Sequence, residues 1–452
     1  MRAPAASARG AHFSALCYSS VVSSSAVIPW VKLQDVRASY QVKEIALDQQ
    51  TDWLFDGAVI RHRLNRFFSI EGVEYTEGET RRGQPLIVQP EIGCLGWLTR
   101  RHNGSGLEFL LQAKFEPGNC NGTQIAPTVQ ATKSNQDRIH GGAEVPFLNF
   151  FASGGPKPEV DLLQTEESDR FCRKLNRNVA VRIEGELAHP DHFRWCALPA
   201  LKFLLAASHT VNTDARSVLA CLDWRIFFGA EPADPAISQA LRASLDLDPA
   251  PQEVDQRLDT ARPACASVRP LSLSKLPGWR VTPMGLEAAG GPFSIRYFQI
   301  QTRLREVPEW TQPLVVSHSA GMCLLAIAVE EGVARVYVRI RQAPGVRDGA
   351  EIGPSCQITP GQRPDSLSRL DRLLLRSARH GRLLAEADNS QEGSRFFKDC
   401  IRYRIALVDR RQVPDTADAL WVTLGTLKHL IDRGKLVSNE MRSAVSFLLP
   451  LL

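Results

Sequence analysis

The sequence predicts a mixed α/β (α+β) chain built from two copies of one module, arranged in tandem. Three observations lead to this prediction. The chain has 452 residues, more than one hydrophobic core usually holds. In each half, segments with the alternation typical of strands are followed by segments with helical spacing. The second half also repeats the first at a nearly constant distance along the chain.

The repeat is clearest in a polar segment that runs from Gln112 to Thr132. Its Pro, Gly, Ile, Gln and Thr positions recur without a gap in residues 343–359, at a distance of 227 residues (344 − 117 = 227). Matches on either side keep this distance between 225 and 228 (293 − 68 = 225; 312 − 84 = 228). A period of this length indicates a duplicated domain and not a solenoid repeat.

The repeat divides the chain into four parts: an N-terminal extension over residues 1–44, a first module over 45–228, a linker over 229–278 and a second module over 279–452. The extension has no acid before Asp35 and contains a serine-rich stretch, so we expect it to be poorly ordered. The linker is rich in Ala, Asp and Pro, and we expect one short helix there, at about Ile237–Leu247.

The first module is expected to begin with strands and to end with helices. An Asn103-Gly104 turn signal separates the apolar run Cys94–Leu98 from an alternating strand over Leu107–Phe115. A further alternating strand covers Val179–Ile183. Two segments with helical spacing follow, at about 198–207 and 214–222, and residues 212 and 213 are suitable N-caps for the second.

The strand over 107–115 predicts a site for acid–base chemistry. Because side chains alternate along a strand, Gln112, Lys114 and Glu116 share the face opposite the apolar residues. A half-solvated outer face is the alternative interpretation. The second copy has Arg339, Arg341 and Ala343 at the matching positions, so only the first copy keeps a carboxylate next to an amine. This asymmetry favours one catalytic copy and one copy that binds or supports.

A cationic cluster lies before the strand at 179–183. Arg170, Arg173, Lys174 and Arg177 fall within eight residues. Arg gives planar bidentate contacts and Lys a point charge, so this set could hold a diphosphate. A solvated charged face is the alternative.

Composition excludes several classes of function. The net charge of +5 is small and dispersed, which argues against nucleic-acid binding. No apolar run approaches the ~20 residues of a membrane span. The ten cysteines form no CxxC pair and no Cys/His cluster with metal-ligand spacing, so we interpret them as reduced thiols of a cytoplasmic protein without a metal site. No GxGxxG motif follows a strand, which accords with a reaction that needs no redox cofactor.

The longest motifs are 67–72, 84–93, 112–135 and 164–178 in the first half, with Trp310–Pro313 and Arg442-Ser443 in the second. These motifs carry a resemblance to the NDP-hexose 2,3-dehydratases of deoxysugar biosynthesis. The resemblance covers the chain from about residue 45 to its end. The resemblance implies two Nudix-like mixed-sheet sandwich modules without the Nudix metal box, and a homodimer. It also implies the substrate dTDP-4-keto-6-deoxyglucose, whose loss of water across C2–C3 gives a 3,4-diketo-2,6-dideoxy sugar. It further implies a role in antibiotic biosynthesis.

This resemblance suggests roles for individual residues. Glu116 is the expected acid/base group and Lys114 its partner near the ketone, with Glu166 and Glu167 as a reserve pair and His140 as a weaker candidate. The cationic cluster is expected to hold the diphosphate. The residues expected to contact nucleotide or sugar are Gln112, Asn119, Asn121, Gln124, Thr128, Gln130, Thr132, Asn135, Gln164 and Asn176. A second-copy ligand site is expected from Arg339, Arg341, Gln357, Glu392 and Arg402.

Alternatives to these roles stay open at this point. Several of the Asn and Gln side chains would be explained equally well by hydrogen bonds to loop backbone. Two other classes of function also compete with a lyase. A Nudix-type diphosphate hydrolase would need a metal-binding glutamate cluster, which the sequence does not show. A non-catalytic nucleotide-sugar binding protein would explain the loss of the acid–amine pair from the second copy.

Overall fold

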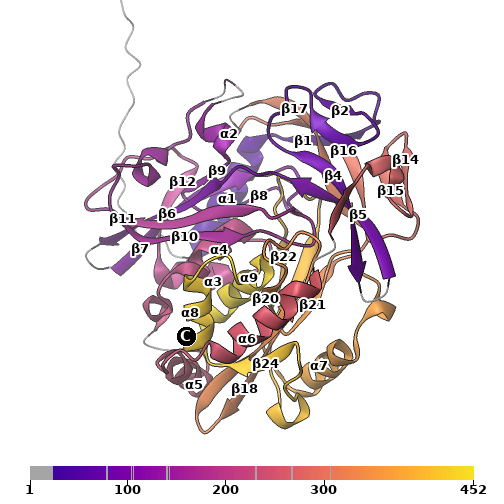
Figure 1. Ribbon diagram of the computed structural model, residues 1–452. Helices are drawn as coiled ribbons and strands as arrows, with labels where there is room; N and C mark the ends of the chain where they lie inside the picture. Colours follow the sequence, from indigo (N-terminus) through magenta and orange to yellow (C-terminus); the bar gives the residue numbers. More distant parts are fainter. Residues whose placement is uncertain are drawn as a thin grey trace, which may run out of the picture.

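The computed structural model describes residues 24–452 except 78–79, 103, 105, 139–140, 142, 230–231, 266–267 and 306. His140, one of the weaker catalytic candidates, lies outside the described residues. The two halves of the chain contain matching elements in the same order, so the repeat seen in the sequence is also a repeat of structure (Figure 1).

The first half consists of small strands, a large sheet and a closing pair of helices. Its strands are β1 (Gln41–Ile45), β2 (Trp53–Phe55), β3 (Val59–His62), β4 (Ser69–Glu77), β5 (Thr80–Val88), β6 (Gly93–His102), β7 (Gly106–Phe115), β8 (Thr123–Ala126), β9 (Val129–Ala131), β10 (Pro158–Thr165), β11 (Leu175–Arg182) and β12 (Phe193–Ala197). Its helices are α1 (Ser24–Ala38), α2 (Lys133–Gln136), α3 (Leu198–Ala206) and α4 (Thr213–Cys221).

The second half follows the same plan after two helices, α5 (Pro235–Leu245) and α6 (Gln252–Ala261). Its strands are β13 (Arg269–Leu271), β14 (Trp279–Thr282), β15 (Gly285–Ala288), β16 (Phe293–Gln301), β17 (Glu309–Ser317), β18 (Gly321–Glu330), β19 (Val333–Arg341), β20 (Glu351–Gly353), β21 (Cys356–Ile358), β22 (Arg382–Ser390), β23 (Cys400–Leu407) and β24 (Ala419–Val422). Its remaining helices are α7 (Arg369–His380), α8 (Leu424–Asp432) and α9 (Asn439–Leu448).

Each half contains a seven-stranded mixed sheet and a five-stranded sheet. In the first large sheet the order is β10-β11-β6-β7-β12, with β8 on β7 and β9 on β6. The pair β11–β6 is parallel and the other pairs are antiparallel. In the second large sheet the corresponding strands β23 and β18 are likewise parallel. This mixed topology agrees with the predicted α+β class.

The two small sheets exchange a strand. β1 pairs with β16 of the second half, with Gln41 opposite Gln301 and Ile45 opposite Tyr297. In return, β13 pairs with β4 of the first half, with Leu271 opposite Gly72. The small sheet of the second half is therefore completed by β1, and the small sheet of the first half by β13. Neither half completes its small sheet alone.

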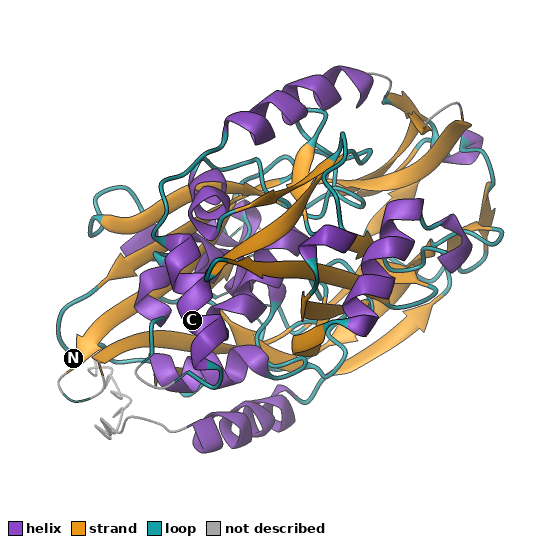
Figure 2. Ribbon diagram, turned by 90° about the horizontal axis from the view of Figure 1, so that it is seen from below, coloured by secondary structure: helices purple, strands orange, loops and turns teal. Residues whose placement is uncertain are grey.

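The main core lies between the two large sheets. Helices α3, α4, α8 and α9 lie there (Figure 1), and the view from below also shows helices packed between strands (Figure 2). Their apolar side chains join those of both sheets in one buried cluster. Two fully buried arginines connect the halves across this core. Arg216 donates to Ser446 Oγ at 3.0 Å and lies 3.7 Å over the Phe447 ring, while Arg442 donates to Ser217 Oγ at 2.9 Å. A buried guanidinium requires such partners.

Two segments differ from the expectations. Residues 24–38 of the expected disordered extension form α1, whose Trp30 is buried and donates Nε1–H to the Asp191 carbonyl at 3.0 Å. The stretch 229–278 contains the expected helix as α5, but also α6 and β13. Helix α6 is polar apart from Val254 and Leu258, which are buried, so its short apolar stripe gave little signal. Within the described residues, no helix has the length and apolar character required to cross a bilayer.

Candidate active site

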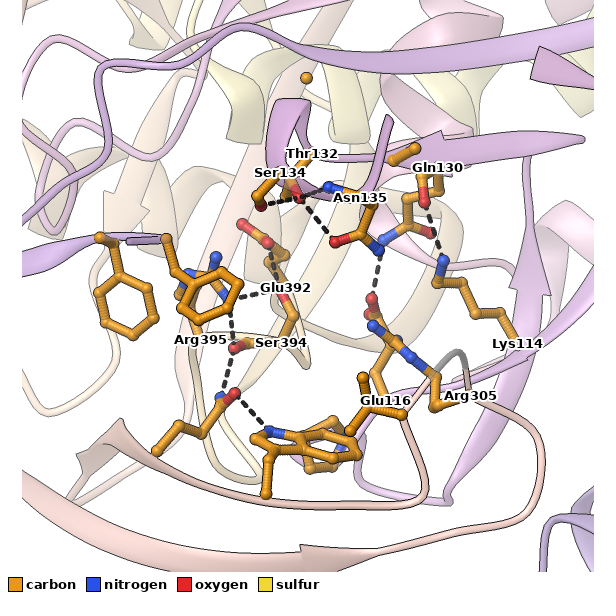
Figure 3. Close-up of a pocket in the computed structure, with 18 of the residues that line it drawn as sticks. Lys114, Glu116, Gln130, Thr132, Ser134, Asn135, Arg305, Glu392, Ser394 and Arg395 are labelled. Carbon is orange, nitrogen blue, oxygen red and sulfur yellow. Dashed lines mark hydrogen bonds between the residues drawn. The ribbon is translucent and has the colours of Figure 1, made fainter. Parts of the chain in front are cut away.

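A cavity of about 320 Å³ lies where the large sheet of the first half meets the small sheet of the second half. Figure 3 shows Lys114, Glu116 and Gln130 on one side and the residues Glu392, Ser394 and Arg395 facing them. This volume is at the lower end of the range typical of ligand pockets. The cavity combines polar and charged groups from both halves, so it is the strongest candidate for the active site among the described residues.

Strand β7 and the turn after it place the predicted acid–amine pair in this cavity. Lys114 is 7 % exposed and Glu116 is 2 % exposed, and both line the cavity. Lys114 Nζ donates to the Gln130 carbonyl at 2.8 Å, and Gln130 Nε2 donates to Glu116 Oε1 at 2.8 Å. The polar face of this strand is therefore an inner wall, and the half-solvated alternative does not apply to these two residues.

Helix α4 contributes a second carboxyl group, Asp214. Asn212 caps the helix by accepting a hydrogen bond from the Ala215 amide at 2.9 Å, and its Nδ2 donates to Gln130 Oε1 at 2.9 Å. The cap thus orients the same Gln130 that contacts Glu116. Asp214 follows in the first turn, is 3 % exposed and lines the cavity.

The opposite wall comes from the loop between β22 and β23. Glu392, Ser394 and Arg395 line the cavity, and Ser394 Oγ donates to Glu392 Oε1. Arg395 Nη2 donates to Gln89 Oε1 at 3.0 Å and its guanidinium lies 4.2 Å from the Phe68 ring centroid. These contacts hold Arg395 firmly at the boundary between the halves.

The two walls meet at Gly118. Its amide donates to the Gly393 carbonyl at 2.7 Å, and the Lys398 amide donates to the Gly118 carbonyl at 2.7 Å. A Cβ on Gly118 would lie 1.6 Å from the Phe396 carbonyl oxygen. Glycine at this position is therefore required for the close approach that forms the cavity.

Burial controls the protonation of both carboxyl groups. The pKa of Glu116 is raised, because burial outweighs the opposing charges of Lys114 and Arg305. The pKa of Asp214 is raised well above its ordinary value by burial and by the neighbouring carboxylates, Glu392 first among them. Nearby charges therefore favour ionised Glu116 more than ionised Asp214, which is the separation that an acid–base pair needs.

Aromatic side chains and one further cation complete the lining. Trp53, His62, Phe68 and Trp310 line the cavity, and the Trp53 and Phe68 ring centroids lie 4.6 Å apart. Trp310 Nε1–H donates to Gln312 Oε1 at 2.8 Å, which fixes the indole. Arg305 lines the cavity from the loop between β16 and β17 and donates to the Phe115 carbonyl at 3.2 Å.

The structure brings together part of the predicted site. The predicted residues that line the cavity are Lys114, Glu116, Gln130, Thr132, Asn135, Asn176 and Glu392. Glu392, expected in a second-copy site, lies in the same cavity as Glu116, because the loop that carries it packs against the first half. Thr132 caps α2 and bonds Asn135 Oδ1 at 2.9 Å, so this short helix positions both residues.

The reserve pair lies behind the cavity wall and does not line it. Glu166 accepts hydrogen bonds from Asn176 Nδ2 at 2.9 Å and Asn439 Nδ2 at 2.7 Å, and burial raises its pKa to about 7. Both carboxyl oxygens of Glu167 lack a hydrogen-bond partner among the described residues. Burial, followed by the charge of Glu440, raises the pKa of Glu167 well above its ordinary value.

Most of the polar side chains predicted to contact nucleotide or sugar lie outside the cavity lining, and nearly all of them form hydrogen bonds within the protein. Asn119 Nδ2 donates to the Gly122 carbonyl at 2.8 Å and Asn121 Nδ2 to the His209 carbonyl at 2.8 Å. Thr128 Oγ1 donates to the Leu110 carbonyl at 2.6 Å. Gln124 bonds Ser390 Oγ, Gln164 bonds the Ile431 carbonyl, and Gln112 is on β7 outside the cavity lining. The alternative that such side chains satisfy backbone groups fits these residues.

The four predicted phosphate-binding cations do not converge. Arg170 stacks over the Phe293 ring at 4.1 Å, and Arg173 is exposed. Lys174 donates to the Glu91 carbonyl, and Arg177 pairs with Asp161 at 2.7 Å. None of the four lines the cavity.

The matching position in the second copy is filled by the protein itself. Arg341, Gln357 and Thr359 correspond to Lys114, Gln130 and Thr132 (341 − 114 = 227). All three donate to one carboxylate oxygen of Asp169, at 3.1, 3.2 and 2.9 Å.

In the first copy the position of Asp169 is taken by the neutral Ser394 (394 − 169 = 225). The other two predicted second-copy cations, Arg339 and Arg402, pair with Asp371 at 2.5 Å and Asp388 at 2.8 Å. The cations expected to bind a second ligand are thus each paired with an internal carboxylate.

Sequence reasoning missed many residues of the cavity, among them Asp214, Arg305, Trp310 and Arg395. Asp214 was placed at the start of a predicted helix, where an acid is ordinary. Trp310 and Arg395 belong to the second half, which was expected to support its own site. A signal for Arg395 existed in the repeat, because it matches Arg170 of the cationic cluster (395 − 170 = 225).

Comparison with known proteins identifies the family. A profile of the NDP-hexose 2,3-dehydratases matches residues 24–222 and again residues 252–448. The chain is similar to three proteins named dTDP-4-dehydro-6-deoxy-α-D-glucopyranose 2,3-dehydratase. It is 33 % identical to the Amycolatopsis orientalis protein over 447 residues, covering 92 % of this chain and 90 % of the relative.

The other two relatives are similar to the same extent. Identity is 32 % to the Streptomyces violaceoruber protein, covering 92 % of this chain and 95 % of the relative. Identity is 31 % to the Saccharopolyspora spinosa protein, covering 91 % and 88 %. Because the family profile matches both halves and the relatives align over nearly their whole length, this chain belongs to the NDP-hexose 2,3-dehydratase family.

Proposed function

We propose that this chain is a hydro-lyase that removes water across C2–C3 of dTDP-4-keto-6-deoxyglucose in deoxysugar biosynthesis. The product is the 3,4-diketo-2,6-dideoxy sugar nucleotide. The observation that supports this most is the cavity itself, which is lined by buried Glu116, Lys114 and Asp214. In this cavity the neighbouring charges favour the ionised form of Glu116 more than that of Asp214. Family membership supports the same reaction.

In the first step Glu116 takes the proton from C3, which the neighbouring C4 ketone makes acidic. The electron pair of the C3–H bond moves to form an enolate over C3, C4 and the ketone oxygen. A base in this role needs a pKa closer to neutrality than an ordinary carboxyl group, and burial of Glu116 provides it. The Lys114 ammonium, on the same strand face, donates to the enolate oxygen.

In the second step the C2–O bond breaks. The enolate electron pair forms the C2=C3 double bond, and the hydroxyl leaves as water after receiving the proton of Asp214. Burial raises the pKa of Asp214 well above its ordinary value, which favours the protonated form that a proton donor needs. The resulting enol returns to the ketone by gaining a proton at C2 and losing one from the C3 hydroxyl, so the reaction is redox-neutral and needs no redox cofactor.

The nucleotide is proposed to occupy the aromatic part of the cavity. Trp310 and Trp53 offer flat faces on which a base can stack. Arg305 supplies a cation for the diphosphate, a role that the sequence had suggested for the cluster at 170–177. Gln130, Thr132 and Asn135 supply amide and hydroxyl groups for the sugar.

The broader setting is proposed from the family resemblance. Each half, over about 45–228 and 279–452, is proposed to be a Nudix-like module, and the enzyme is proposed to act as a cytoplasmic homodimer without binding nucleic acid or membranes. A pathway to an antibiotic sugar is the proposed context.

A single incubation tests the reaction. Purified protein is mixed with dTDP-4-keto-6-deoxyglucose, and the nucleotide products are followed by mass spectrometry. The proposal expects loss of one water from an intact sugar nucleotide. Cleavage to dTMP would indicate a diphosphate hydrolase, and an unchanged substrate that nevertheless binds would indicate a binding protein. Either of these results would overturn the proposal.

A further inference from the structure

Three side chains far apart in the sequence meet outside the cavity. Cys120 lies in the loop between β7 and β8, His209 in the loop between α3 and α4, and Cys400 at the start of β23 in the second half. The two sulfur atoms and one ring nitrogen all lie within 4.8 Å of one another. The sequence spacing gave no sign of this cluster, because its members are 89 and 191 residues apart (209 − 120 = 89; 400 − 209 = 191).

The cluster is reachable and its imidazole is oriented. All three side chains are partly exposed. His209 Nδ1 lies 3.3 Å from Ser390 Oγ, and its other nitrogen, Nε2, faces Cys400 Sγ at 4.0 Å. The Cys120 amide donates to the same Ser390 Oγ at 3.1 Å. A partner on the far ring nitrogen is the usual arrangement behind a histidine that binds a metal.

We propose that Cys120, His209 and Cys400 form a binding site for a thiophilic divalent cation, Zn²⁺ above all. Two thiolates and one imidazole are a typical zinc donor set, with bond lengths of about 2.0–2.3 Å and tetrahedral geometry. Three protein ligands leave the fourth position to water.

The location gives the ion a structural role at the cavity wall. Cys120 follows the turn with Gly118, and Cys400 follows the loop with Glu392 and Arg395. These two loops already hold one another through the backbone hydrogen bonds of Gly118. An ion bound between them joins the first half to the second at the point where the two cavity walls meet.

The three donor residues occur in only one of the two symmetry-related positions of the duplicated fold. The matching positions on the other side are Arg347, Lys435 and Leu175 (347 − 120 = 227; 435 − 209 = 226; 400 − 175 = 225). None of these offers a thiolate or an imidazole. His209 and Lys435 share the left-handed backbone, with φ of 51° and 62°, so the loop geometry belongs to the fold while the donor set does not.

Metal content tests the proposal directly. The full-length protein is stripped with a chelator, loaded with Zn²⁺, dialysed, and measured by plasma mass spectrometry for wild type, C120S, C400S and C172S. Cys172 is the matched control, because it is also partly exposed but lies outside the cluster. We expect one Zn²⁺ per chain in wild type and C172S, and at least a tenfold lower zinc content in C120S and C400S. Equal metal content in all four proteins would overturn the proposal.

Cobalt gives a readout that does not depend on whether a variant folds. Wild-type protein loaded with Co²⁺ should show the intense thiolate-to-cobalt charge-transfer absorption of a site with two sulfur ligands. Absence of this band, or a Cys120–Cys400 disulfide found in its place under reducing conditions, would contradict the proposal. No residue of the cluster lines the cavity, so failure of metal binding would leave the proposed dehydration untouched.

Discussion

Replacement of Glu116 by Gln tests the assignment of the base. The change keeps the shape of the side chain, and the new amide oxygen can still accept the hydrogen bond from Gln130 Nε2. What is lost is the ability to take a proton. A positioned general base contributes about 10²–10⁴ in rate. At 1.36 kcal/mol for each factor of ten, this is about 2.7–5.4 kcal/mol of activation free energy.

The structure predicts that this loss falls on kcat. Glu116 is buried and is proposed to act on the proton at C3, while Arg305, Trp310 and Trp53 are the groups proposed to hold the nucleotide. KM should therefore change little while kcat falls by the full factor. Burial raises the pKa of Glu116, so its charged form is costly, and a neutral amide there should not lower the melting temperature.

Glu166 provides the matched control for this experiment. It is also a buried glutamate of the first half, but it lies outside the cavity and accepts two amide donors. E166Q should lower the melting temperature, because one new N–H group would face a donor, and should leave kcat within a few fold. Steady-state kinetics by chromatography and thermal unfolding measure both variants. An E116Q enzyme with unchanged kcat, or an E166Q enzyme with the larger loss of kcat, would refute the reasoning.

Three further outcomes follow from the structure. The pH profile of kcat should be bell-shaped. Activity should fall as pH drops through the raised pKa of Glu116, the proposed base, and fall again as pH rises through the raised pKa of Asp214, the proposed acid. A flat profile would contradict this. G118A should lower the free energy of unfolding by about 1–3 kcal/mol and reduce activity, because the added Cβ meets a backbone carbonyl of the second half. A denaturant titration that shows no change in stability would contradict this prediction. D169S should lower the free energy of unfolding by about 3–5 kcal/mol, because Arg341 loses its main partner. The difference from wild type should shrink in acid, since the pKa of Asp169 is lowered despite its burial and the wild-type carboxylate becomes protonated there. The kcat of the variant should stay unchanged.

Several strands of the first large sheet and the closing helices of the first half could be predicted from local pattern. The alternation over 107–115 and the helical spacing near 198–207 and 214–222 correspond to β7, α3 and α4. The repeat itself predicted that one plan would occur twice. These features are encoded within short windows of sequence, so a reading of the chain alone can recover them.

The exchange of β1 and β13 could not be predicted in this way. Both strands are short and lie in segments without strong alternation, and their pairing joins residues more than 190 positions apart. Only the relative placement of the two halves decides which sheet each strand completes.

Only part of the candidate site could be predicted, because its other residues come together through the relative placement of the two halves. Lys114 and Glu116 stand out because one strand places them together and because the second copy lacks the pair. Arg170 looked like a ligand for phosphate, yet it stacks on Phe293 of the second half. Asp214 becomes a site residue only because α4 directs its first turn into the cavity.

Exchange of the C3 hydrogen tests the central claim most directly. Substrate carrying deuterium at C3 is incubated with wild type, D214N and E116Q, and loss of the label is compared with loss of water. If Glu116 is the base and Asp214 the acid, D214N should release deuterium to solvent while eliminating little water, and E116Q should do neither. Release of the label by E116Q at the wild-type rate would show that another group takes the proton and would contradict the account.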